Sequence, residues 1–108
     1  MAKAEINAGI CGFHTTVIAR QNEDGIIHLD ITSECEWVRK LASQLQDVDP
    51  MKEAFWRRTS TPRIYELMPK CLAHPACPVP SGIVKAIEVE AGLALPADAT
   101  IHVSRDNE

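Results

Sequence analysis

The sequence predicts one α+β domain in which a small antiparallel sheet of about three to four strands packs against three to four helices. Three observations predict this fold class. Short alternating runs rich in β-branched residues fill the first third of the chain, amphipathic helical patterns follow, and a strong turn signal joins two of the alternating runs. A length of 108 residues is close to the common size of a single domain. We therefore expect residues 1–108 to form one domain.

The strands are predicted from the alternation of apolar and polar residues. Residues 3–7 alternate loosely, and residues 15–20 are rich in β-branched side chains. The sequence Asn-Glu-Asp-Gly at residues 22–25 is typical of a hairpin turn. Residues 26–32 then form the returning strand, with Ile27, Leu29 and Ile31 on one face. Residues 100–104 alternate once more and indicate a final edge strand.

The helices are predicted from capping signals and from apolar residues at helical spacing. Ser33 followed by Glu36 matches a capping box, which makes Cys35 the second residue of the first helix. Residues 51–57 form a short helix, and residues 60–62 cap another that runs to about residue 70, with an end or kink at Pro69. The last helix follows the proline-rich residues 78–80 and is stopped by Gly92.

The composition excludes several classes of protein. The chain has 45% apolar residues and a net charge of −4, which is typical of a globular protein and too mild to favour nucleic acid or an anionic membrane as partner. No apolar run is long enough to span a membrane, and the first residues lack the apolar centre of a signal peptide. We therefore expect a cytoplasmic, reducing location, where four cysteines are more suited to be ligands, catalysts or core residues than disulfides.

Three of the four cysteines occupy places where backbone amides are free. Cys11 lies in a glycine-flanked loop, and Cys35 and Cys77 lie at the starts of two predicted helices. The helix dipole favours the thiolate, so Cys77 is expected to lose its proton easily. Their long spacing does not match a zinc finger, but it suits an α+β domain whose loops gather at one end of a sheet. The three thiols are therefore candidate metal ligands, with Cys71 or His74 as the fourth.

Each of these residues also has an ordinary structural interpretation. Buried cysteines often serve as small apolar side chains, and this interpretation suits Cys71, at a predicted helix end, better than the others. His74 fits a solvent-facing loop histidine as well as a ligand, and His14 is near enough to Cys11 to orient or protonate it.

The order of these features resembles the U-type scaffold of iron–sulfur cluster assembly, the type found in the amino-terminal part of NifU. Cys11-Gly12 matches the first Cys-Gly of that family, Cys35 its second cysteine, Cys77 its third, and the helix from Ile83 the one that follows. The motifs Gly-Ile-Cys-Gly-Phe and Cys-Pro-Val-Pro-Ser also resemble a small uncharacterised family. The first resemblance implies a U-type scaffold-like fold and a thiolate-bound [2Fe–2S] cluster or Zn²⁺. It also implies two partners: a cysteine desulfurase as sulfur donor and an acceptor apoprotein.

The chain departs from the scaffold pattern at three places. Phe13 replaces the aspartate after the first cysteine, Ala76 replaces the histidine before the third, and residues 72–76 replace the chaperone-recognition stretch. The resemblance thus implies a thiol site but not a full assembly cycle. Two further functions stay open on the residues alone. One is a thiol-based redox protein or enzyme that uses Cys77 or Cys35 with a nearby histidine, and the other is an interaction module whose cysteines only pack.

Overall fold

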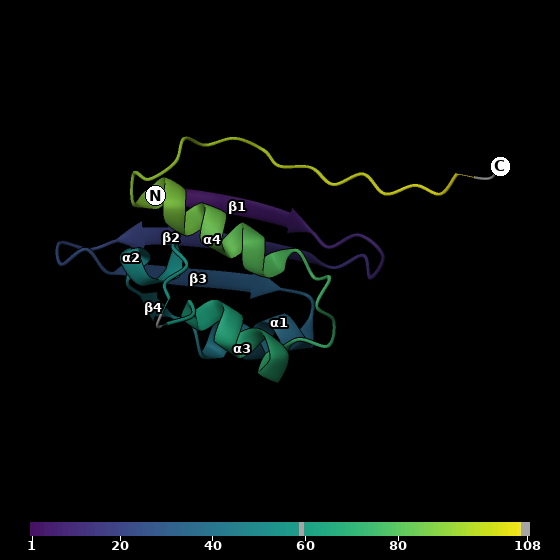
Figure 1. Ribbon diagram of the computed structural model, residues 1–108, viewed down its shortest axis with the longest axis horizontal. Coiled ribbons are helices and arrows are strands. Elements are labelled where there is room, and N and C mark those ends of the chain that lie inside the picture. The colour runs from purple at the N-terminus through teal and green to yellow at the C-terminus, as the bar shows by residue number, and fades with distance from the viewer. Residues whose placement is uncertain (59, 107–108) are drawn as a thin grey trace.

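A four-stranded antiparallel sheet with four helices forms the protein, which confirms the predicted α+β fold class (Figure 1). The computed structural model describes residues 1–58 and 60–106. In chain order the elements are β1 (Ala2–Asn7), β2 (His14–Gln21), β3 (Ile27–Ser33), α1 (Glu36–Ser43), β4 (Asp47–Val48), α2 (Pro50–Glu53), α3 (Arg63–Cys71) and α4 (Val79–Glu90).

The strands follow one another in the sheet in the order of the chain, β1-β2-β3-β4. Ala4 of β1 pairs with Val17 of β2, which pairs in turn with Ile31 of β3. Because neighbouring strands are antiparallel, β1 and β3 run in the same direction. The loop after β1 and the chain that leaves β3 therefore lie at the same end of the sheet (Figure 1).

One face of the sheet is buried by the helices, and the other is open to solvent. Val17, Ala19, Ile27 and Leu29 are buried on the covered face, while alternate residues such as Lys3 are exposed. α4 packs across β1 and β2, and α1 packs against β3 and α3 (Figure 1). This one-sided burial explains why the strands alternate in sequence, since successive side chains point to opposite faces.

Four expectations about the elements need correction. The first helix begins at Glu36 with Cys35 as its N-cap residue, because Ser33 stays in β3 and its hydroxyl accepts the Cys35 N–H at 3.1 Å. Pro69 lies inside α3, which continues to the buried Cys71. The short helix predicted over residues 51–57 is confined to α2, Pro50–Glu53. The edge strand expected over residues 100–104 is also wrong: these residues are exposed and, within residues 1–58 and 60–106, pair with no strand.

Candidate functional site

Cys11, Cys35 and Cys77 lie at the same end of the sheet. Cys11 is in the loop after β1, Cys35 follows the end of β3, and Cys77 directly precedes the N-cap residue of α4. α4 runs antiparallel to β1, since its first half packs on Ile6 near the end of that strand while Glu90 contacts the chain start. The start of α4 is therefore brought to the loop that carries Cys11 and to the exit of β3 (Figure 1).

A tight turn presents Cys11 to solvent. The Gly12 N–H donates to the Gly9 carbonyl at 2.9 Å, and both glycines have positive φ, at 87° and 72°. Such dihedrals are open to glycine and disfavoured for other residues. Nothing lies within 4 Å of a Cβ built at either position, so the turn has open space around it. Cys11 is thus an exposed thiol on a loop that neighbouring side chains do not confine.

Cys35 joins β3 to α1 and is half-buried against the core. Its carbonyl accepts the first helical bond, from the Arg39 N–H at 3.0 Å. The neighbouring Glu34 reaches back to the start of β2, where its carboxylate accepts the His14 N–H at 2.8 Å and lies 3.5 Å from the His14 ring. Sequence reasoning missed Glu34, whose position directly before Cys35 was the available signal. Its carboxylate is directed to His14 at the start of β2.

Cys77 is half-buried against the core. Burial raises the pKa of the Cys77 thiol, the Val79 backbone N–H lowers it, and the thiolates of Cys35 and then Cys11 raise it again. The expectation that Cys77 loses its proton easily is therefore wrong for the free thiol, because burial outweighs the favourable amide at the helix start.

The two residues expected to offer a fourth ligand differ in their surroundings. Cys71 is 1% exposed at the end of α3, where its sulfur accepts a hydrogen bond from Gln44 Nε2 at 3.5 Å. His74 is exposed in the loop that leads to Cys77, and its carbonyl accepts the Cys77 N–H at 3.3 Å. The backbone of His74 therefore lies beside that of Cys77, whereas Cys71 lies in the core.

The thiols do not form a preformed metal site. Among the residues that the structure describes, no group of three or more His, Cys, Asp or Glu side chains has the geometry to hold an ion. Cys11, Cys35, Cys71 and Cys77 are all free thiols. The donor set itself suits soft cations, since thiolate is the ligand that zinc and iron–sulfur centres prefer. Binding would require the exposed Cys11 turn to close over the other two sulfurs.

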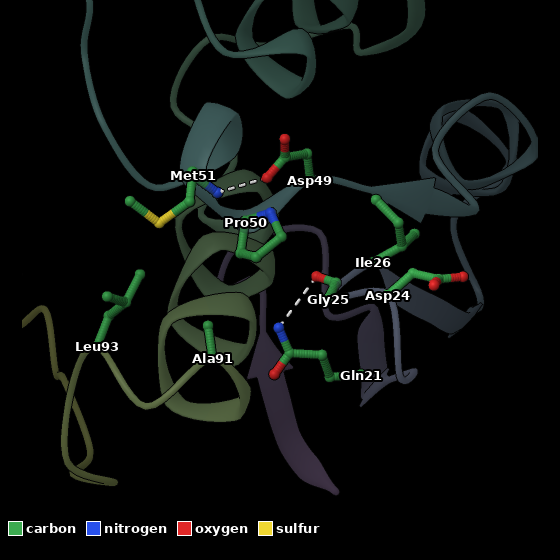
Figure 2. Close-up of a pocket in the computed structure, with 9 residues that line it drawn as sticks. All are labelled: Gln21, Asp24, Gly25, Ile26, Asp49, Pro50, Met51, Ala91 and Leu93. Atoms are coloured by element: carbon green, nitrogen blue, oxygen red, sulfur yellow. Dashed lines mark hydrogen bonds between the residues drawn. The ribbon is translucent and has the colours of Figure 1, made fainter.

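A separate cavity of about 280 Å³ lies between the β2–β3 turn, α2 and the end of α4, at the opposite end of the sheet (Figure 2). Two of its polar side chains, those of Gln21 and Asp49, form hydrogen bonds with the backbone. Gln21 Nε2 donates to the Gly25 carbonyl at 3.0 Å, and an Asp49 oxygen accepts the Met51 N–H at 3.0 Å. This cavity therefore has a structural explanation and is distinct from the thiol cluster.

In the described part of the chain, no helix is long and apolar enough to cross a bilayer. Comparison of the chain with curated proteins and with solved structures gave no significant match. Comparison with protein families matched residues 2–103, nearly the whole chain, to the Family of unknown function (DUF6951). The matched residues include the three clustered cysteines and the segment that follows α4. The chain therefore belongs to the DUF6951 family.

Proposed function

We propose that this chain binds a thiolate-ligated metal centre, either a [2Fe–2S] cluster or Zn²⁺, through Cys11, Cys35 and Cys77. One observation carries the proposal: three cysteines from distant parts of the chain lie at one end of the sheet. Thiolate is the form that binds metal, and a bound cation displaces the thiol protons and so offsets the burial that raises the pKa of Cys77.

The surroundings of each thiol are compatible with this role. The Cys11 turn is exposed and unconfined, so it is able to move toward Cys35 and Cys77, which are fixed at helix starts. The Val79 amide favours the charged form of Cys77, and hydrogen bonds of this kind tune thiolate-bound centres. For the fourth ligand we favour His74 over Cys71, because Cys71 is buried in the core against Gln44.

Two other functions fit the thiols less well. A nucleophilic enzyme needs thiolate at neutral pH, whereas burial and the neighbouring thiols raise the pKa of Cys77. An interaction module whose cysteines only pack would explain Cys71, but it would not explain the exposed Cys11. Metal binding uses both the exposed and the half-buried thiols.

The resemblance to the U-type scaffold extends this proposal to partners and location. If the likeness reflects a shared site, a cysteine desulfurase would donate sulfur, an acceptor apoprotein would receive the cluster, and a reducing cytoplasm would keep the thiols available. The support is the matching order of the three cysteines along the chain. Anaerobic incubation with Fe²⁺, cysteine, a desulfurase and a thiol reductant, which supplies the remaining electrons that reduce the persulfide sulfur to sulfide, should then give the visible absorption of a [2Fe–2S] cluster.

Metal analysis of anaerobically purified protein tests the proposal directly. We expect about one zinc ion or one two-iron cluster per site in the wild type and a loss of at least tenfold in affinity in Cys11→Ala, Cys35→Ala and Cys77→Ala. Cys71→Ala is the matched control, since it also removes one thiol but should keep the metal. His74→Ala tests the fourth ligand.

Two results would contradict metal binding. Metal-free protein that takes up neither Zn²⁺ nor Fe²⁺ with sulfide would exclude it, and a disulfide among the three clustered cysteines would then favour the redox function. Equal metal loss in Cys71→Ala and Cys77→Ala would point to a general loss of fold rather than a site, which circular dichroism of each variant would show.

A further inference from the structure

The segment after α4 has the pattern of a strand but lacks a strand partner. Residues 93–106 form neither helix nor strand and are exposed throughout. Ile101 and Val103 are 82% and 85% exposed, and Thr100, His102 and Ser104 alternate with them. In an extended chain, Ile101 and Val103 point to the same side. A segment with one apolar and one polar face suits the edge of a sheet, where a single face is covered.

β1 offers such an edge. It is six residues long and, within the part of the chain that the structure describes, pairs only with β2. The other edge strand, β4, has only two residues. On the helix-covered side of β1, Ala4 and Ile6 are only partly buried, although they pack against the core. An added strand with apolar residues on that side would complete their burial and satisfy the unpaired backbone groups of β1.

In the structure the segment runs past β1 of its own chain without pairing with it. Leu93 is held beside the β2–β3 turn, next to the start of β1, by a 2.8 Å bond to the Glu88 carbonyl. From there seven extended residues reach Thr100, roughly 23 Å away, whereas the six residues of β1 span about 20 Å. Figure 1 shows the segment continuing past the end of β1. It makes the molecule 54 Å long although its other dimensions are 31 and 29 Å.

We propose that residues 100–104 of one chain pair with the outer edge of β1 in a second copy, and that the exchange is reciprocal. Each copy then supplies the strand that the other lacks, and two-fold symmetry closes the assembly as a dimer. A second copy fits better than another protein, because each copy of this chain carries both the free edge of β1 and the segment that would cover it. The polar face, with Thr100, His102 and Ser104, would lie beside Lys3 and Glu5 on the open side of the sheet.

Sedimentation and hydrogen exchange of the full chain test this pairing. We expect a dimer of the wild type, and a monomer for the double variant Ile101→Asn/Val103→Asn, which removes the apolar face. In the same variant the amides of β1 should exchange faster by on the order of tenfold, while those of β3 should not change. Thr100→Asn/Ser104→Asn is the matched control on the opposite face of the segment and should remain dimeric. All samples contain a chelator, so that the result does not depend on metal binding.

Each alternative partner of the β1 edge predicts a different combination of oligomeric state and amide protection. A wild type that is monomeric with protected β1 amides would mean pairing within one chain, and a dimer with unprotected β1 amides would mean that the two segments pair with each other. Either result overturns the proposal, as does a monomer without protection. A dimer that survives Ile101→Asn/Val103→Asn would also overturn it.

Discussion

At the scale of single residues, the protonation of Cys77 is the property most open to measurement. Burial and the thiolates of Cys35 and Cys11 together raise its pKa despite the Val79 amide. We therefore expect the alkylation rate of Cys77, followed by mass spectrometry of the metal-free protein, to rise with a midpoint above the ordinary thiol value of about 8.5. In Cys11→Ser/Cys35→Ser the midpoint should fall, because two repelling charges are gone. Cys71→Ser should leave it unchanged. A wild-type midpoint below about 8.5 would mean that the helix start dominates after all.

Glu90 is the second residue whose ionisation affects the molecule. Its carboxylate accepts the Gln21 N–H at 2.9 Å, which lowers its pKa, and the chain-start ammonium 3.1 Å away lowers it further while burial opposes both. A lowered pKa in the folded state contributes stability above the unfolded value, and this contribution is lost as the pH falls through the folded value. Glu90→Gln should reduce the free energy of unfolding at pH 7 by about 1 kcal/mol, with a smaller difference below about pH 4.

Urea denaturation across this pH range measures the effect. The matched control is Glu5→Gln, which removes an equal charge from an exposed ion pair on β1 and should change the unfolding free energy little. A constant difference between wild type and Glu90→Gln from pH 7 to pH 3 would contradict the assignment.

At the scale of elements, the close approach of α4 to β1 depends on Gly82. A Cβ at this position would overlap Cδ1 and Cγ1 of Ile6. On an exposed helix, Gly→Ala stabilises by about 1 kcal/mol, but here we expect Gly82→Ala to destabilise by roughly 1–3 kcal/mol, because the Ile6 side chain must leave its position or the helix must move off the sheet. Ile6→Ala removes both overlapping atoms, so the two substitutions together should cost less than their sum in chemical denaturation. Ser81→Ala, exposed in the same helix, is the control. Additive costs would refute the contact.

The elements also show which parts of the fold are determined by residues that are close together in the sequence. The turn at residues 22–25 was predicted because its bonds are local: the Asn22 side chain accepts the N–H groups of Asp24 and Ile26, and Gly25 has a φ of 84°. The start of α1 was misplaced because Ser33 is held in β3 by a distant residue, Thr15, whose hydroxyl lies 2.8 Å from that of Ser33. A capping pattern contains no information about such pairing.

At the scale of the whole molecule, the position of three cysteines at one end of the sheet was predictable and their chemistry was not. Antiparallel neighbours return loops to the same end of a sheet, so cysteines after β1 and β3 were expected to meet. The acidity of Cys77 depends on how deeply α4 buries its own N-terminus, which is a tertiary property that no local pattern encodes. The same limit applies to residues 100–104, where alternation predicted a strand but could not identify the partner edge.

The clustered thiols belong to three elements, so metal binding should stabilise the whole fold. A ligand that binds only the folded state at a free concentration of about 100 times its dissociation constant adds about 2.7 kcal/mol to the free energy of unfolding. For a domain of this size we expect the melting temperature to rise by roughly 10 °C or more when Zn²⁺ is added to chelator-treated protein. Calorimetry should show the same rise in Cys71→Ala and none in Cys77→Ala, because only Cys77 lies among the other thiols. A rise of equal size in Cys77→Ala would show that zinc stabilises the chain elsewhere, and no rise in the wild type would show that the three thiols do not close around zinc.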